Sequence, residues 1–328
     1  MGGYDMKNLR IVLNLFAASI CCFMVVAAPN SWSSDALPDY PAVKVSNRVW
    51  VIHGPTELPN PENKGFMNNP AFVVTSTSVV VIDPGSTLET GRMVLRQIRR
   101  ITDKPITHVF ASHIHGDHWL GNHAIREAYP SAVFYAHPIM IEQAHSGQAE
   151  TWVDMMEQLT EGASKGTEAV IPDHILKDGQ IIKVGDVSFR IYLSEWAHTK
   201  TDAMIEIIED SLLATGDNVL YQRIARMDDA SFRGNIAACE QAMNLRLKHY
   251  IPGHGISGGQ EIVKPFCDYL KILYENVAEL YEEGLSDYEM KDAVVESLSE
   301  YRAWPGFEDQ VGKHISLALL EIEQAEFE

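Results

Sequence analysis

The feature that most constrains this chain is the segment Ser112-His113-Ile114-His115-Gly116-Asp117-His118-Trp119, between an apolar strand pattern (residues 107–111) and a helical pattern. Imidazole nitrogens and carboxylate oxygens are good zinc ligands, and ligands at alternate positions on a loop that leaves a strand can converge on one side. Polar residues at a strand end, with Asp117 as a helix cap, are the alternative, but capping does not call for three histidines. The segment therefore predicts a metal site, with His113 and His115 facing one ion and Asp117 and His118 facing another.

Two ions need more ligands than this segment provides, and three later turns offer them. His198 follows a long strand pattern, Asp217 ends another, and His254 lies in Ile251-Pro252-Gly253-His254-Gly255. Each is a ligand residue placed just after an apolar run, where the edge of a sheet presents functional groups. A single histidine after a strand is more often a hydrogen-bonded core or surface group. The prediction therefore rests on the whole set.

The chain alternates β-rich runs with amphipathic helical patterns, and no low-complexity linker divides it. Strand patterns that alternate between hairpins and helical crossovers predict sheets covered by helices. The strands are predicted over residues 48–53, 71–77, 78–83, 107–112, 132–136, 181–193, 203–208 and 212–215, and the helices over residues 88–101, 118–128, 152–161, 232–247 and 261–283. The helix over 152–161 is predicted either to pack in the core or to form a lid.

The N-terminus has the layout of a secretory signal. Lys7 and Arg10 precede an apolar run from Ile11 to Ala28, and small polar residues follow. We predict a signal peptide over residues 1–33 and a periplasmic or secreted protein that is not stably inserted in a membrane. The alternative is an uncleaved anchor, because the run is near the lower length limit for spanning a bilayer and Pro29 disfavours cleavage directly after Ala28.

Composition narrows the class of protein. Hydrophobic residues make up 46% of the chain, which excludes a disordered protein. The 26 Lys and Arg against 45 Asp and Glu give a net charge of −19, which repels phosphate backbones and argues against nucleic acid as a partner. Removal of the signal leaves only Cys239 and Cys267, and a chain of this size does not need a disulfide. Both lie in helical patterns, where buried free thiols are common.

With these motifs, and with the turn Val81-Ile82-Asp83-Pro84-Gly85, the sequence resembles the metallo-β-lactamase superfamily from about Val49 to Gly255. The resemblance implies a four-layer αβ/βα sandwich: two mixed β-sheets flanked by helices, with the metals at one edge between the sheets. We expect this domain over residues 40–283. Residues 284–328 are expected to form a helical extension packed on the same domain or on a second subunit, which leaves a homodimer open.

The resemblance also implies a ligand set. One zinc ion is assigned to His113, His115 and His198, and the other to Asp117, His118 and His254, with Asp217 bridging the two. Iron or manganese are alternatives to the two Zn²⁺ ions. A hydroxide shared by the ions would attack a carbonyl carbon, and Asp117 is the candidate to orient it and relay its proton. Asp83 either accepts a hydrogen bond from a ligand histidine or serves only as a turn residue.

The same positions narrow the substrate. In zinc β-lactamases with a three-His and Asp-Cys-His pattern, a cysteine occupies the bridging position and a lysine three residues on holds the substrate carboxylate; here these are Asp217 and Leu220. An aspartate at the bridging position is typical of the hydrolase, glyoxalase-type and lactonase branches, and indicates a small ester, thioester or lactone as substrate. Alternatives are β-lactam or phosphodiester hydrolysis, and a metal-stabilised binding protein without turnover.

Two further comparisons with the superfamily bear on function. An iron-dependent redox enzyme is another alternative, but that branch replaces the second histidine of the motif with glutamate, and His115 argues against it. The stretches Pro59–Gly65 and Ser194–Thr199 most resemble zinc hydrolases linked to quinoprotein relay and sulfur-oxidation systems. Tyr221 or Arg223, just after the bridging aspartate, could contact the substrate; the alternative is a packed aromatic ring and a surface cation.

Overall fold

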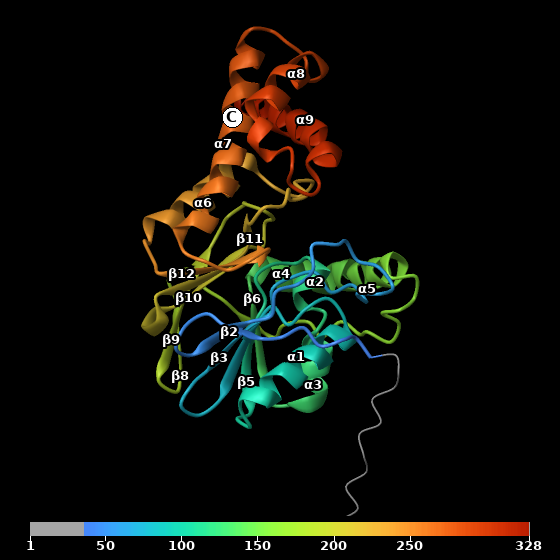
Figure 1. Ribbon diagram of the computed structural model, residues 1–328, viewed down its shortest axis with the longest axis vertical. Helices are drawn as coiled ribbons and strands as arrows, with labels where there is room; N and C mark the ends of the chain where they lie inside the picture. Colours follow the sequence, from blue (N-terminus) through green and yellow to red (C-terminus); the bar gives the residue numbers. More distant parts are fainter. Residues whose placement is uncertain (1–35, 328) are drawn as a thin grey trace, which may run out of the picture. The chain divides into compact units, whose positions relative to one another are not determined.

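Two mixed β-sheets pack face to face in the computed structural model, which describes residues 36–327. Helices cover the outer face of each sheet (Figure 1). This arrangement confirms the predicted four-layer sandwich of two mixed sheets flanked by helices. The predicted signal peptide lies outside the described residues. Among the helices of residues 36–327, none combines the length and apolar character needed to cross a bilayer.

The first sheet has seven strands in the order β1-β2-β3-β4-β5-β6-β7, antiparallel from β1 to β4 and parallel from β4 to β7. Its strands are β1 (Val43–Lys44), β2 (Val49–Val51), β3 (Ala71–Val74), β4 (Val79–Ile82), β5 (Ile106–Phe110), β6 (Val133–Ala136) and β7 (His174–Ile175). Parallel neighbours require crossovers, and helices α1 (Leu88–Ile101) and α3 (Asn122–Ala128) provide them and bury their apolar faces on this sheet.

The second sheet has five strands in the order β12-β11-β10-β9-β8. These are β8 (Ile181–Val184), β9 (Val187–Leu193), β10 (Ala203–Ile207), β11 (Leu212–Leu220) and β12 (His249–His254). The single strand predicted over residues 181–193 is in fact a hairpin, because Gly185 adopts a φ of +60° and reverses the chain. Helices α6 (Phe232–Asn244) and α7 (Lys264–Glu282) pack on its outer face.

Strand β12 is absent from the predicted strands because Pro252 and Gly253 disfavour extended structure in a sheet interior. Among the strands of the described residues it pairs only with β11, and apart from a single bridge from Tyr250 to Gly258 it lies at the edge of the sheet, where a missing backbone N–H is tolerated. Pairing with β12 also explains why β11 continues to Leu220 rather than ending at Thr215.

The last two long helices, α8 (Asp287–Ser297) and α9 (Phe307–Ala325), pack with α7 around one apolar core (Figure 1). A buried polar contact also joins them to the loop after β11: His314 Nε2 donates to the carbonyl oxygen of Ala225 (3.1 Å), and the Tyr269 hydroxyl donates to His314 Nδ1 (2.8 Å). The division of domains at residue 284 stays a prediction. Cys239 and Cys267 are buried free thiols.

The apolar layer between the two sheets should carry much of the stability. The rings of Phe110 in β5 and Phe189 in β9 lie 5.5 Å apart, and both side chains are fully buried. We expect Phe110→Ala to lower the free energy of unfolding by about 3–5 kcal/mol, because it removes apolar contacts and leaves a cavity. Urea unfolding measures this. The control is Ile181→Ala, at an edge-strand residue that is 53% exposed, which should lower the free energy of unfolding by less than about 1 kcal/mol. Equal decreases in the two variants would contradict the prediction.

Candidate metal centre

The histidine-rich segment leaves β5 and is fixed between the two sheets. Ala111 N donates to the carbonyl oxygen of Tyr135 in the first sheet (2.9 Å), and the carbonyl oxygen of Ser112 accepts from Ala203 N in the second (2.8 Å). The segment then enters the short helix α2 (Gly116–Trp119), whose fully buried Trp119 donates from Nε1 to the carbonyl oxygen of Ile114 (2.8 Å). The loop is therefore held in one conformation by both sheets and by its own indole ring.

The helix predicted over residues 118–128 is divided in two. It starts earlier, at Gly116, and is interrupted at Gly121 before α3 begins. Gly121 N donates to the carbonyl oxygen of Gly85 (2.7 Å), and a Cβ atom on Gly121 would lie only 2.3 Å from the carbonyl oxygen of Pro84. This close approach requires glycine, and it brings the turn after β4 against the metal-binding segment.

The other three candidate ligands reach the same edge from the second sheet. His198 lies in the loop between β9 and β10, Asp217 lies in β11, and His254 is the last residue of β12. Gly216, just before the aspartate, has a φ of +53° and coincides with a shift of register between β11 and β12. The bulge turns this part of β11 toward the first sheet, so that a Cβ atom on Gly216 would lie 2.7 Å from Ser112.

All seven predicted residues meet, in two sets whose possible ligand atoms lie within 4.8 Å of one another. The first set is His113, His115, His198 and Asp217, and the second is Asp117, His118 and His254. Asp217 Oδ2 also lies 3.4 Å from His254 Nε2, and its Oδ1 lies 3.2 Å from His118 Nε2. This carboxylate therefore faces both sets, as expected of the bridging residue.

The donor atoms fit divalent cations. His113 Nε2, His118 Nε2 and Asp217 Oδ1 are buried and make no hydrogen bond of good geometry among the described residues, although the last two lie 3.2 Å apart. Buried polar atoms are nearly always paired, so several such atoms at one place indicate a missing partner. Nitrogen and carboxylate oxygen donors in sets of three or four match the coordination that zinc prefers. The clusters can therefore hold metal ions.

The ring nitrogens that face away from the site are held by hydrogen bonds. Asp83 Oδ2 accepts from His118 Nδ1 (2.9 Å), and the carbonyl oxygen of Met67 accepts from His254 Nδ1 (2.8 Å). His115 Nε2 lies 3.3 Å from Asp229 Oδ2. Such acceptors fix the orientation and tautomer of a ligand histidine. Asp83 therefore has both of the predicted roles: it accepts a hydrogen bond from a candidate ligand histidine, and it forms the turn after β4, with a φ of +51°.

Two of these contacts were not predicted from the sequence. Met67 contributes only its backbone, so its side chain gives no signal, and Asp229 lies in a loop with no pattern that relates it to the histidine motif. The loop before β3, which is rich in Pro and Asn, also reaches the centre, and one of its asparagines makes the contact. Asn69 Nδ2 donates to the carbonyl oxygens of Pro252 (2.9 Å) and Gly255 (2.7 Å), on either side of His254.

Two imidazoles of the first set, those of His113 and His198, are neutral. Burial lowers the pKa of His198 to about 3, and burial together with the charge of His118 lowers the pKa of His113 far below its usual value. A neutral imidazole has a free lone pair for a metal ion, so neither histidine needs to lose a proton on binding.

The second set has the opposite electrostatics. Burial alone would lower the pKa of His118, but the carboxylates of Asp117 and Asp217 outweigh it and raise that pKa well above its usual value. The pKa of His254 is raised in the same way, chiefly by Asp217. Burial acts to raise the pKa of both carboxyl groups, yet the histidines hold it well below the usual range. Without metal, the raised pKa values favour protons on these histidines, which compensate the buried carboxylates.

Helix α5 (Ala149–Leu159) packs against α2 beside this centre. Met156 is buried in an apolar cluster, whereas the ring of half-buried Trp152 lies 5.0 Å from that of His115. Met156 thus fits the core prediction for this helix, and Trp152 forms one wall of the centre.

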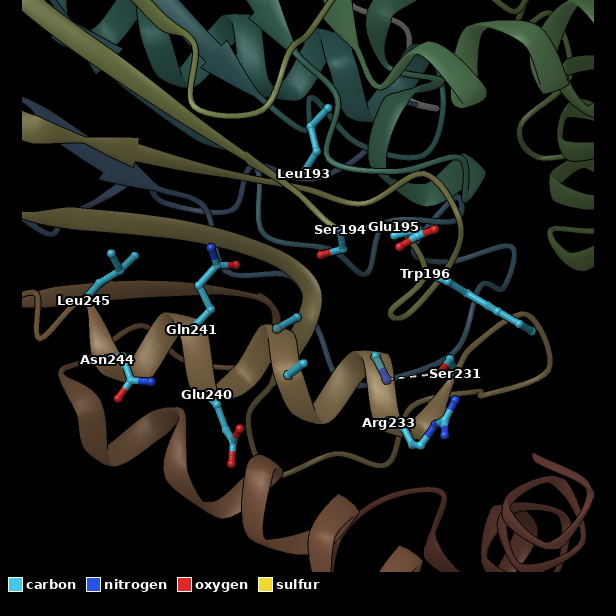
Figure 2. Close-up of a pocket in the computed structure, with 13 residues that line it drawn as sticks. Leu193, Ser194, Glu195, Trp196, Ser231, Arg233, Glu240, Gln241, Asn244 and Leu245 are labelled. Carbon is cyan, nitrogen blue, oxygen red and sulfur yellow. Dashed lines mark hydrogen bonds between the residues drawn. The ribbon is translucent and has the colours of Figure 1, made fainter. Parts of the chain in front are cut away.

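A cavity of about 860 Å³ lies beside the centre rather than over it. Figure 2 shows Glu195 and Trp196, from the loop that carries His198, on one side of this cavity, and residues of α6 such as Gln241 on the other. None of the seven candidate ligands lines it. It adjoins the loop of His198, and we assign it no ligand.

A model of the metallo-beta-lactamase superfamily matches residues 64–254, which include all seven candidate ligands. The chain belongs to the metallo-β-lactamase superfamily. The members of this superfamily are mostly hydrolases, which supports the prediction that this chain is an enzyme. No curated protein matches the sequence.

Two solved structures of this fold are similar. A metallo-beta-lactamase from Pontibacter korlensis has 19% sequence identity and a TM-score of 0.56, covering 70% of this chain and 98% of its own. The stereoselective inverting sec-alkylsulfatase Pisa1 from a Pseudomonas species has 18% identity and a TM-score of 0.62; the match covers 87% of this chain and 50% of that one. At these identities the similarity supports the superfamily fold and nothing finer.

The contact between Asp83 and His118 can be tested through metal affinity. We expect Asp83→Asn to weaken zinc binding by about 10–100-fold, because the neutral amide is a poorer acceptor for the His118 N–H. Asparagine tolerates a positive φ, so the turn should persist. Competition with a chromophoric chelator measures the dissociation constants. Asp103→Asn, which removes an exposed carboxylate, is the control, and unchanged affinity in the Asp83 variant would contradict the role.

The electrostatic difference between the sets predicts a pH effect. Zinc must displace protons from His118 and His254, whose pKa values are raised, but not from His113 and His198, whose pKa values are lowered. Binding to the second set should therefore tighten as the pH rises from 6 to 8, with little change at the first. Calorimetry in buffers of different ionisation enthalpy measures the protons released. Equal release for both ions would contradict this assignment.

Proposed function

We propose that this chain is a dinuclear zinc hydrolase that acts on an ester, thioester or lactone-like carbonyl group of a small molecule. The observation that carries the proposal is the place of Asp217, whose carboxylate oxygens lie 3.2–3.5 Å from nitrogens of both histidine sets. A bridging carboxylate holds two ions close together. Two bound divalent cations would lower the pKa of a water molecule and polarise a carbonyl oxygen.

The role of the protein itself centres on Asp117. Its Oδ2 lies 3.2 Å from His254 Nε2 and 3.4 Å from His118 Nε2. Because the pKa of Asp117 is held well below its usual range, the carboxylate is ionised at neutral pH. It can therefore accept a hydrogen bond from the attacking water, orient it, and pass its proton toward the leaving group.

The structure argues further against β-lactams as the main substrate. Leu220, at the position of the β-lactamase lysine, is 1% exposed and packs in the apolar core around α7. It offers no charge to a substrate carboxylate. The alkylsulfatase similarity adds sulfate esters to the substrates that merit testing, because the shared fold extends over 87% of this chain. We also propose export to the periplasm or beyond, on the basis of the N-terminal signal layout.

A substrate panel tests the proposed function. Zinc-loaded protein is assayed with carboxylic esters, thioesters, lactones, β-lactams, phosphodiesters and sulfate esters, and the expected result is hydrolysis of a carbonyl ester, thioester or lactone that chelation abolishes and zinc restores. Metal analysis of natively purified protein separates this proposal from an iron-dependent redox enzyme. Bound zinc with no turnover across the panel would support a metal-stabilised binding protein instead.

Replacement of Asp117 tests its role in turnover. We expect Asp117→Asn to lower kcat by at least about 100-fold, since the amide cannot accept the proton. Zinc content is measured in the same samples, so that loss of metal and loss of proton transfer are told apart. Asp154→Asn removes an exposed carboxylate on α5 and should leave kcat unchanged. Activity near the parent level in the Asp117 variant would exclude the proton-relay role.

A further inference from the structure

Arg223 is a partly buried cation that forms no ion pair with any of residues 36–327. It follows the end of β11, six positions after Asp217, and its Nη1 atom has no solvent contact and no hydrogen-bond acceptor among the described residues. Burial lowers the pKa of its guanidinium group, yet an arginine side chain keeps its charge in proteins. A buried charged donor without an acceptor is unfavourable by more than a neutral one. The unpaired donor of Arg223 therefore indicates that a ligand atom binds there.

Backbone contacts bring the loop of Arg223 beside the second metal set: Tyr221 N donates to the carbonyl oxygen of His254 (3.1 Å), and a Cβ atom on Gly255 would lie 2.5 Å from the carbonyl oxygen of Tyr221. The electrostatic coupling agrees with this placement. The carboxylates of Asp217 and Asp117 both act to raise the pKa of Arg223. In turn, the charge of Arg223 acts to lower the pKa of His254. The guanidinium group nevertheless makes an ion pair with neither carboxylate, so Nη1 keeps a donor that a bound anion could satisfy.

The backbone around Arg223 is held on both sides. Tyr221 N donates to the carbonyl oxygen of His254 (3.1 Å), and Ile224 N donates to that of Pro305, in the turn before α9 (3.0 Å). The contact of Ala225 with His314, described above, adds a third fixed point. This anchoring positions the arginine in advance, which reduces the entropy lost when a ligand binds.

The charge of the loaded centre favours an anion. Asp117, Asp217 and Asp83 carry three negative charges and two divalent ions would carry four positive ones, which leaves one positive charge to which Arg223 adds another. The exposed carboxylate of Asp229 offsets part of this at the rim. A guanidinium group presents parallel N–H donors that match the oxygens of a carboxylate, sulfate or phosphate group.

We propose that Arg223 binds an anionic oxygen group of the substrate, so that the enzyme acts on substrates that carry a carboxylate, sulfate or phosphate group near the bond to be broken. The substrate class in this inference rests on the proposed hydrolase function. The first test below does not, because it measures anion binding without turnover. It assigns to Arg223 the anion-binding role that the buried Leu220 cannot perform.

The first test measures binding without turnover. Sulfate, acetate and glutarate are titrated by calorimetry into zinc-loaded protein and into its Arg223→Gln and Arg226→Gln variants. Arg226 is an exposed arginine in the same loop, paired only with Asp228, so its variant removes the same charge. We expect Arg223→Gln to raise the Kd of the best-bound anion at least tenfold and Arg226→Gln to change it less than twofold. Equal effects of the two variants, or no effect of either, would overturn the proposal.

The second test compares a neutral ester with monoesters of dicarboxylic acids that share its leaving group. Arg223→Gln should lower kcat/KM at least tenfold for the charged esters and less than twofold for the neutral one. Hydrolysis that is equally unaffected for both would refute the role of Arg223 and leave the hydrolase standing. Anion binding that depends on Arg223, without hydrolysis of any ester, would support the role of Arg223 and refute the proposed hydrolase function.

A conservative variant guards against misfolding. Arg223→Lys keeps the charge but loses the parallel N–H donors, so we expect an intermediate Kd, with zinc affinity and circular dichroism unchanged. If Arg223→Gln does not fold, the lysine variant carries the test, and a Kd equal to that of the parent would contradict recognition by the guanidinium group. The three anions distinguish a planar carboxylate from a tetrahedral oxyanion as the preferred group.

Discussion

Two carboxylates buried among imidazoles determine what this centre can do. Asp117 and Asp217 have little solvent contact, and an ionised carboxylate in such a place must be compensated. Without a metal ion, protons on His118 and His254 provide that compensation. With metal ions, the same lone pairs become ligands, so proton and metal compete for one set of atoms. The rest of the structure serves to hold these side chains close together despite their charges.

Asp83 shows how closely the fold and the centre are joined. It ends β4 in a left-handed conformation that a residue other than glycine rarely adopts, and such strain persists only where surrounding contacts enforce it. Its Oδ1 accepts from Ser112 N (2.7 Å) and its Oδ2 from Ser112 Oγ (2.7 Å), as well as from His118. The turn after β4, the end of β5 and one ligand histidine therefore form a single hydrogen-bonded unit.

Periodicity predicts sheets covered by helices, and the spacing of ligand residues after strands predicts that the seven residues form a metal site, because both are local signals. The four layers and the division of the ligands between two ions follow only from the resemblance to the superfamily. Prediction from sequence patterns fails where tertiary contacts decide. Pro252 and Gly253 hide strand β12 from pattern-based prediction, and the interruption at Gly121 depends on the backbone of Gly85, 36 positions earlier. The two open alternatives for Arg223, a surface cation or a substrate contact, could not be separated by pattern, because burial and the lack of an acceptor appear only in three dimensions.

The central claim is that two metal ions lie between the sheets, held by these seven side chains. Anomalous diffraction at the zinc absorption edge, from crystals of zinc-loaded protein, tests it most directly. The account predicts two peaks, one among His113, His115 and His198 and one among Asp117, His118 and His254, both within coordination distance of Asp217. A single peak elsewhere on the surface, or none in crystals that diffract well, would contradict it.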